Sequence, residues 1–211
     1  GSHTRNQNDQ GEIWLKVEET CVFPNYTDKV DSHKNDIAIV KLEKKVDFTE
    51  RISPICLPKK DQPLPRTFYG TGWGHSHADH AHSHDHGHDH GHDHGHDHGD
   101  QRASTLRQAL VEFISNDKCY DEFGEAAPST VFCTAMKFGT PCNHDIGGPV
   151  SQKVDNVWTL FGVVSGGRED FDKPGEYPVL HTRVSLYLDD LVNYFPTTST
   201  GTADLKRCRL V

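Results

Sequence analysis

The chain has 211 residues, which is enough for one domain with a substantial core or at most two small ones. Its formal net charge is −9, and no basic stripe runs along the sequence, so nucleic-acid binding is not expected. The apolar runs reach only about five residues, whereas a helix that spans a membrane needs about 20. These bulk properties exclude a nucleic-acid-binding module and a membrane-spanning helix from the expectations.

Six cysteines and a glycosylation sequon indicate the compartment in which the protein works. The sequon is the Asn-Tyr-Thr sequence that begins at Asn25. Together these features are typical of an oxidising, extracellular environment. We therefore expect a secreted protein that is glycosylated at Asn25, with an export signal upstream of residue 1.

Short β-type runs precede the histidine-rich part of the chain. Residues 12–23 mix alternation with β-branched side chains, and residues 35–42 have the pattern of a buried strand. Residues 67–73 form a further strand pattern that is bounded by glycine. This half of the chain therefore predicts β structure.

The second half repeats the β pattern and ends in one helix. Residues 106–115 fit a helix by their apolar spacing and a strand by their alternation, and their length does not decide between the two. Residues 158–166 predict a strand. Residues 183–195 predict a helix whose apolar face consists of Val184, Leu188, Leu191 and Tyr194 or Phe195. Many strands and one terminal helix favour an all-β barrel or sandwich.

A histidine-rich segment, residues 75–100, interrupts this pattern. It contains twelve His and six Asp, and residues 84–99 are four copies of His-Asp-His-Gly. Without an apolar side chain larger than Ala, the segment cannot offset its ordering entropy, so we expect it to be disordered by itself. The polar tail, residues 196–211, is expected to be loosely ordered as well.

The histidine-rich segment has the composition of a divalent-metal binder. His-x-His spacing in an extended chain puts two imidazoles within reach of one ion, and neutral imidazole suits Zn²⁺ and Cu²⁺. We expect loose, multi-site binding of zinc or copper, with Asp as an auxiliary ligand. The candidate ligands are His75, His77, His80, His82, His84, His86, His88, His90, His92, His94, His96 and His98.

The same segment can also respond to pH. With unperturbed pKa values of about 6.5, its twelve imidazoles would carry it from strongly negative to strongly positive on acidification. A positive or metal-loaded segment would attract anionic polysaccharide. The alternative is that the repeat expanded by slippage and is tolerated because it lies on a solvated loop.

Seven motifs identify a family. In chain order they are NDIAIVKL, ISPICLP, GTGWG, FCTA, GGPV, FGVVSGG and HTRVSLYLDDL. In order and rough spacing the chain resembles the trypsin-like serine proteases of the S1 family, and within them the invertebrate clip-domain type.

The resemblance covers residues 1–195 apart from the insertion at 75–100. It implies two orthogonal antiparallel β-barrels and a C-terminal helix, with the first barrel incomplete at its N-terminus. The expected organisation is thus one trypsin-like domain, 1–195, interrupted by the histidine-rich insertion and followed by the flexible tail, 196–211.

The catalytic positions that the resemblance implies are degenerate. In this family a Ser attacks, a His removes its proton and an Asp orients the His. Asp36 matches the orienting Asp, but Ile146 occupies the position of the nucleophile, and a hydrocarbon side chain cannot attack a carbonyl group. The histidines that precede Asp36 are His3 and His33, and neither has the sequence context of the family's general base.

Two residues beside Ile146 complete the comparison with the family's site. His144 replaces a Gly whose backbone N–H belongs to the oxyanion hole, and we find no second metal ligand placed near it by spacing. Asp145 matches the carboxylate that pairs with the new N-terminus of activated relatives. The resemblance therefore implies a serine protease homologue that has lost protease activity.

The family's specificity pocket is expected to be closed. A gapless alignment puts Val179 where a Gly opens the slot and Thr140 where a trypsin has Asp, with Ser165 and Gly167 as the other pocket positions. An alternative alignment through residues 173–177 keeps a glycine and an open slot. We expect His181, which replaces a Tyr of the family pattern, to be a packed side chain rather than a ligand.

The resemblance also implies a disulfide between Cys119 and Cys133. Cys56 corresponds to a cysteine that tethers the upstream chain, which predicts a disulfide-linked N-terminal chain. Three intrachain pairings remain open among the other cysteines, which are Cys21, Cys56, Cys142 and Cys208.

The leading functional hypothesis is a secreted, non-catalytic trypsin-like protein. By analogy it would be a cofactor, adaptor or decoy in a proteolytic cascade of the innate-immunity or melanisation type, with extracellular proteases or their substrates as partners. The alternative is a metal-binding or metal-buffering extracellular protein on a protease scaffold. A protease that is active through an unusual alignment is the third reading.

Overall fold

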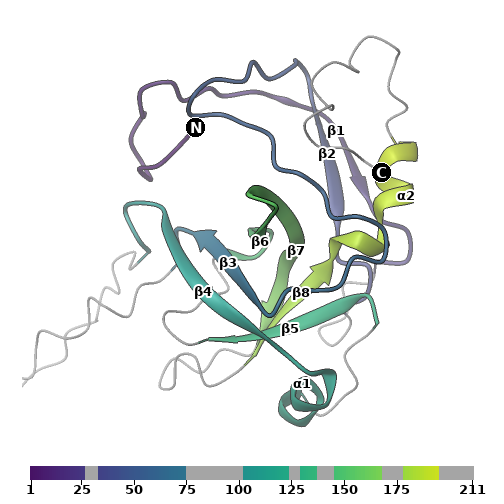
Figure 1. The fold of residues 1–211 in the computed structure, drawn as a ribbon. Coiled ribbons are helices and arrows are strands. Elements are labelled where there is room, and N and C mark those ends of the chain that lie inside the picture. The colour runs from purple at the N-terminus through teal and green to yellow at the C-terminus, as the bar shows by residue number, and fades with distance from the viewer. Residues whose placement is uncertain (27–32, 75–101, 124–128, 137–144, 168–177, 195–211) are drawn as a thin grey trace, which may run out of the picture.

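The computed structural model describes residues 1–26, 33–74, 102–123, 129–136, 145–167 and 178–194, which form a mostly β molecule (Figure 1). The strands are β1 (Val17–Val22), β2 (Ala38–Leu42), β3 (Thr67–Gly72), β4 (Arg107–Ile114), β5 (Val131–Met136), β6 (Pro149–Val154), β7 (Val157–Gly167) and β8 (Val179–Arg183). The helices are α1 (Asn116–Phe123), the 3-10 helix η3 (Val184–Leu186) and α2 (Leu188–Tyr194).

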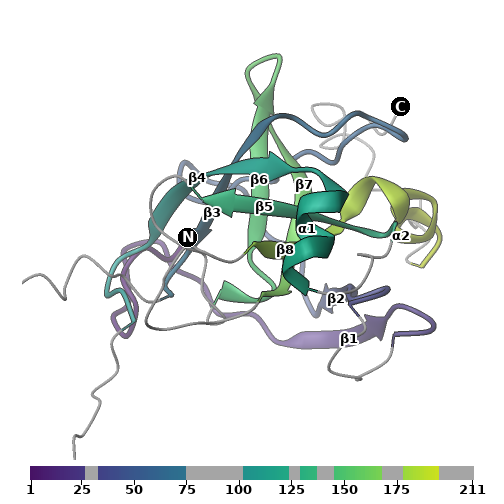
Figure 2. The ribbon, with the colours of Figure 1, turned by 90° about the horizontal axis from the view of Figure 1, so that it is seen from below.

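Six strands close into one antiparallel barrel in the order β3-β4-β5-β8-β7-β6. Its longest hairpin, β6–β7, turns through Asp155 and Asn156, whose φ angles of 49° and 65° suit the two-residue turns that match the twist of a hairpin. Figure 2 shows this hairpin projecting beyond the rest of the barrel. The all-β prediction and the C-terminal helix are confirmed.

Three phenylalanines fill the barrel. The ring centroid of Phe68 lies 5.2 Å from that of Phe132 and 5.8 Å from that of Phe161. They come from β3, β5 and β7, where inward-facing positions place them opposite one another. Burial of each such side chain contributes about 1.5–3 kcal/mol, so this cluster is a main source of the barrel's stability. Buried valines surround it: Val111, Val150, Val164 and Val179.

The strand pair β1–β2 lies outside the barrel (Figure 2). Among the described residues, these two strands represent the expected first barrel. The prediction that residues 35–42 form a buried strand is wrong, because β2 is exposed at every position except the half-buried Ile39. An apolar sequence shows that a strand is suited to burial, but in β2 only the side chain of Ile39 is partly covered by the rest of the described structure.

The ambiguous segment 106–115 is a strand. β4 pairs with β3 on one side and with β5 on the other, from Glu112 opposite Thr67 to Ile114 opposite Cys133. Val111 is fully buried between these neighbours. Pairing on both edges, which is a long-range interaction, therefore overrides the helical spacing of the local sequence.

The predicted helix 183–195 is shorter than expected. Arg183 is extended at the end of β8, residues Val184–Leu186 form one 3-10 turn, and the α-helix begins at Leu188. Val184 and Leu188 are buried and Leu191 is half-buried, as the predicted face requires. Phe195 lies outside the described residues.

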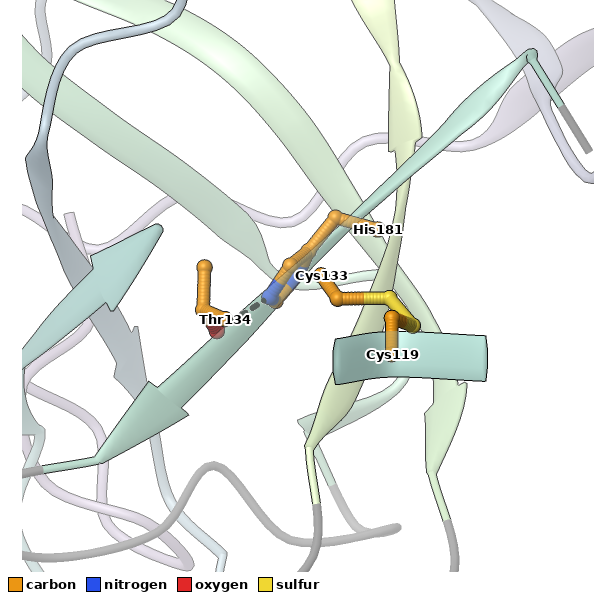
Figure 3. The surroundings of a disulfide bond; sticks show 4 residues. All are labelled: Cys119, Cys133, Thr134 and His181. Atoms are coloured by element: carbon orange, nitrogen blue, oxygen red, sulfur yellow. Dashed lines mark hydrogen bonds between the residues drawn. A yellow bond between two sulfur atoms is a disulfide. The ribbon is translucent and has the colours of Figure 1, made fainter. Parts of the chain in front are cut away.

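The disulfide between Cys119 and Cys133 is confirmed. It ties α1 to β5 across a Cα–Cα distance of 6.1 Å, and both cysteines are buried (Figure 3). Cys21 is a free thiol, whereas Cys56 is buried and disulfide-bonded to a partner outside the described residues. The prediction that Cys56 links a separate N-terminal chain stays a prediction.

Candidate functional site

The residues around Asp36 dock the β1–β2 unit onto the barrel. The Asp36 backbone carbonyl accepts a hydrogen bond of 2.7 Å from the Thr182 hydroxyl on β8. Its neighbour Asn35, with a left-handed φ of 59°, is buried and accepts a hydrogen bond of 3.1 Å from the Tyr187 hydroxyl. The segment that carries the family's orienting Asp is therefore fixed on β8 and on the turn before α2.

A polar cluster of three side chains forms where this segment meets β7. The Ser165 hydroxyl donates a hydrogen bond of 2.6 Å to Oδ2 of Asp36. Nδ1 of His33 lies 3.0 Å from the same hydroxyl oxygen. Serine thus stands between the carboxylate and the imidazole.

Because Ser165 lies between Asp36 and His33, the directions of the two hydrogen bonds are linked. A hydroxyl group has one proton, and that of Ser165 is donated to Asp36. The hydroxyl oxygen must therefore accept from His33, whose Nδ1 carries a proton in this arrangement. Such an imidazole cannot remove a proton from Ser165, so the cluster does not perform the base chemistry of a catalytic triad.

The imidazole of His33 is packed directly on the barrel. A Cβ atom at Gly166 would lie 2.7 Å from Cε1 of His33, so a larger residue there would displace the imidazole from this position. Ser165 is 7 % exposed, which shows that the cluster is closed to solvent around the hydroxyl. Sequence reasoning gave His33 no role, because no local signal links it to Ser165, which is 132 residues away.

The turn with Ile146 lies beside this cluster. The backbone N–H of Gly147 donates to the Val164 carbonyl at 2.8 Å, and the Val164 N–H donates to the Gly148 carbonyl at 2.9 Å. Gly147 has a φ of 84°, a conformation that favours glycine. Backbone hydrogen bonds therefore fix the turn on β7, while the side chain of Ile146 is 54 % exposed.

Asp145 anchors the other side of the turn. Its Oδ1 accepts a hydrogen bond of 2.9 Å from the Gly74 N–H at the end of β3. The carboxylate fills the space beside Gly72 and Gly74, where any Cβ would collide with it. The turn is thus held between β3 and β7 without a nucleophile at its tip.

The pocket positions are only partly within the described residues. Val179 lies opposite Gly167 in the β7–β8 ladder, and its side chain belongs to the buried core cluster. Thr140, His144 and residues 173–177 lie outside the described part of the chain. The choice between the two alignments therefore stays a prediction.

The candidate metal ligands of the insertion, His75 to His98, also lie outside the described residues. Within the ranges that the structure describes, no group of three or more His, Cys, Asp or Glu side chains could hold a metal ion. The two chain ends of the insertion are described and lie together, because the Ala103 N–H donates to the Gly74 carbonyl at 3.1 Å. Arg5 stabilises this root of the insertion, where Gly74 and Ala103 meet, through a hydrogen bond of 3.2 Å from its Nε to the Ala103 carbonyl.

His181 is a packed side chain, as predicted. It is fully buried, its Nε2 lies 2.8 Å from Oγ1 of Thr134, and its Nδ1 finds no hydrogen-bond partner among the described residues (Figure 3). Burial lowers the pKa of His181 to about 3, because a charged imidazole would lose its hydration there.

The predicted glycosylation site, Asn25, is exposed in a turn after β1, with a φ of 64°.

These features define a trypsin-like architecture, and the comparison with known proteins agrees. The trypsin family model matches residues 1–191, so the chain belongs to the trypsin family. No helix in the described ranges is long and apolar enough to cross a membrane.

Three curated relatives illustrate the similarity. CLIP domain-containing serine protease B4 of Anopheles gambiae is 27 % identical over 198 residues, which cover 89 % of this chain and 50 % of that protein. Venom serine protease Bi-VSP of Bombus ignitus is 30 % identical over 89 % of this chain and 49 % of its own length. Transmembrane protease serine 11G of Mus musculus is 33 % identical, over 82 % and 38 %. The chain spans about half the length of the first two.

The polar cluster leads to a stability prediction. Ser165→Ala removes the hydroxyl that Asp36 and His33 share, and leaves two polar groups partly buried without it. We expect a loss of about 1–3 kcal/mol in the free energy of unfolding, measured by urea denaturation. Ser151→Ala is the matched control, since Ser151 is also 7 % exposed but lies outside the cluster. Equal losses in both variants would contradict a specific role for the cluster.

Proposed function

We propose that this trypsin-family protein is secreted, does not hydrolyse peptide bonds and works by binding other proteins. The observation that carries the proposal is the exposed hydrocarbon side chain of Ile146 at the tip of an otherwise well-formed turn. An alkyl group cannot form an acyl-enzyme, and no adjacent base can activate it. We therefore propose that the turn at Ile146 has a structural role and no catalytic chemistry.

The cluster of His33, Ser165 and Asp36 is the obvious candidate for a displaced triad, and its geometry argues against that role. Ser165 donates its proton to the carboxylate rather than to the imidazole. Its hydroxyl is also buried, so a peptide carbonyl could not approach it. The cluster instead joins the β1–β2 unit to the barrel, which gives Asp36 a structural role.

The kinds of relatives support a role in proteolytic cascades. Two of them are named as a CLIP-domain protease and a venom protease. We propose that this chain acts beside such enzymes as a cofactor, adaptor or decoy, with extracellular proteases or their substrates as partners. The exposed Asn25, which begins the sequon, fits an extracellular location and glycosylation there.

The histidine-rich insertion supports a second activity, the binding of zinc or copper. Neutral imidazoles at His-x-His spacing suit both ions, with Asp as an auxiliary ligand. The metal would be loosely bound and would serve no catalytic step. Metal buffering on a protease scaffold is the alternative function that this segment favours, and a charged insertion would also bind anionic polysaccharide.

Labelling with a fluorophosphonate probe, which modifies activated serines, tests the loss of protease activity. We expect no labelled residue and no hydrolysis of peptide substrates by this chain. The variant Ile146→Ser should stay unlabelled too, because the imidazole of His33 already donates its Nδ1 proton to Ser165. An active trypsin labelled in parallel is the control. A covalent adduct on any serine of the wild-type chain would overturn the proposal.

A further inference from the structure

Cys56 is disulfide-bonded, and its partner lies outside the described residues. Cys21 is a free thiol, and the disulfide between α1 and β5 uses two further cysteines. The cysteines of this chain that remain as partners are Cys142 and Cys208. The free thiol of Cys21 thus removes one of the three intrachain pairings that the sequence leaves open, and the position of Cys56 decides between the other two.

Cys56 is buried against the beginning of β7. Its backbone N–H donates a hydrogen bond of 3.1 Å to the Trp158 carbonyl, and its carbonyl accepts one of 2.8 Å from the Leu160 N–H. These bonds form a parallel bridge between Cys56 and Thr159. Thr159 also pairs with Gln152 of β6 in the antiparallel hairpin. Since a strand has two edges, Cys56 lies on the edge of β7 that faces away from β6.

The turn that follows Cys142 lies at a different place on β7. Gly148 accepts a hydrogen bond of 2.9 Å from the Val164 N–H, on the same edge of β7 as β6. Val164 is about 16 Å along β7 from Thr159, and two strand spacings of about 4.8 Å separate the two edges. The turn is therefore on the order of 20 Å from Cys56.

This distance is too long for Cys142. Asp145 is fixed in the turn by its hydrogen bond of 2.9 Å from the Gly74 N–H, and its own carbonyl accepts one of 2.8 Å from the Gly148 N–H. The three residues back to Cys142 span about 10 Å at most, and a disulfide joins Cα atoms that are up to about 6.8 Å apart. Together they fall short of Cys56.

Cys208 has the necessary reach. The segment after Cys56 leads to α2, where Nζ of Lys60 forms an ion pair of 2.7 Å with Oδ2 of Asp189. Lys60 lies within about 14 Å of Cys56 along the chain, and Tyr194 ends α2 about 8 Å beyond Asp189. With the two side chains, Tyr194 is within about 35 Å of Cys56, whereas the chain from Tyr194 to Cys208 extends to about 45 Å.

We propose that a disulfide between Cys56 and Cys208 fastens the C-terminal tail, residues 195–211, to the barrel beside the beginning of β7. The two Sγ atoms form the bond, their thiol protons are released, and the two electrons reduce a donor disulfide of the oxidising compartment to two thiols. Cys142 then keeps its thiol, as Cys21 does. A partner of the proposed adaptor must accordingly bind without a covalent link through Cys56. This assignment and a link from Cys56 to a separate N-terminal chain exclude each other.

Peptide mapping of the secreted protein without reduction tests the proposal. Free thiols are blocked with iodoacetamide in denaturant, and the protein is then digested with trypsin. Cleavage after Arg and Lys places Cys56 in the peptide 52–59 and Cys208 in the dipeptide 208–209. We expect these two to be found as one linked species by mass spectrometry. The peptide 138–153, which contains Cys142, should carry the blocking group.

Two serine variants form a matched pair for the same assignment. With thiols counted in denaturant, Cys208→Ser should gain one free thiol relative to the wild type, because Cys56 loses its partner. Cys142→Ser should lose one, because it removes a thiol that is already free. The map of the wild-type protein needs no variant, so its result holds even if Cys208→Ser folds poorly.

Three results would overturn the proposal. The first is a linkage of the peptide 52–59 to 138–153, with the thiol changes of the two variants reversed. The second is its linkage to a peptide from upstream of residue 1 in a longer form of the protein, which would assign Cys56 to an N-terminal chain. The third is a blocked, unpaired Cys56. Each of these outcomes leaves the proposed loss of protease activity unaffected, because the disulfide lies away from the turn at Ile146.

Discussion

Deletion of residues 75–101 is expected to abolish the binding of zinc and copper. Twelve of the sixteen histidines of the chain lie in this segment. The ranges described by the structure contain no group of three or more metal-binding side chains that could replace them. In equilibrium dialysis at pH 7.4, we expect several equivalents of Zn²⁺ or Cu²⁺ per wild-type chain. The deletion variant should bind less than one, with an affinity at least about tenfold weaker.

The fold should tolerate this deletion. The chain ends at Gly74 and Arg102 are already adjacent, because the Ala103 N–H donates to the Gly74 carbonyl at 3.1 Å. The root is secured independently by the Arg5 backbone N–H, which donates to the Ser104 carbonyl at 2.7 Å. A short glycine linker can therefore join the ends, and a shorter loop also lowers the entropy cost of closure.

A second variant separates the imidazoles from the rest of the segment. It keeps the length and all six Asp residues of 75–100 but replaces each of the twelve His by Asn. We expect it to lose metal as completely as the deletion does. If it kept the wild-type stoichiometry, the carboxylates would be the principal ligands. Retention of metal by the deletion variant would refute the assignment of the insertion altogether.

The sequence was most informative where function requires a fixed local conformation. Asp36 and the turn at Gly147 belong to short motifs, and the order of these motifs along the chain is enough to identify the barrel. The disulfide between Cys119 and Cys133 followed from the same resemblance. Such features are marked by short motifs whose order along the chain can be read without knowledge of their contacts.

Long-range contacts decided what the sequence left open. Residues 106–115 became a strand because β3 and β5 supply partners on both edges, and no local pattern states that. The packing of His33 on Gly166 depends on a contact between residues 133 positions apart in sequence, where a missing Cβ makes room for the imidazole. The exposed β2 is the opposite case, since its apolar pattern is genuine but one face remains uncovered in the described residues.

The largest effect of pH on stability is expected from His181. Its pKa in the folded protein is lowered to about 3 by burial, whereas an unfolded histidine has a pKa of about 6.5. Above pH 6.5 neither state binds the proton, so the pH does not matter for this residue. Below 6.5 the unfolded state takes up the proton and the folded state does not. The free energy of unfolding should therefore fall by about 1.4 kcal/mol per pH unit until the pH approaches 3.

His181→Gln isolates this contribution from that of the carboxylates, which titrate in both proteins. Glutamine does not titrate and can still hydrogen-bond to Thr134, the partner of Nε2 at 2.8 Å. At pH 7 the variant should be less stable, because a different shape fills a fully buried site. Between pH 7.5 and 5 the wild type should lose about 2 kcal/mol relative to the variant.

Urea denaturation at pH 7.5, 6.5, 5.5 and 5.0 measures this difference, with His3→Gln as the control because His3 is exposed. The curves of the wild type and the control should run parallel, while that of His181→Gln should be flatter and approach the wild type as the pH falls. Parallel curves for all three proteins would mean that His181 is protonated equally in the folded and unfolded states. That result would be incompatible with an imidazole that is fully buried against Phe132, whose ring centroid lies 5.1 Å from that of His181. Because this burial depends on the β5–β8 ladder, the same measurement tests the packing of the barrel around it.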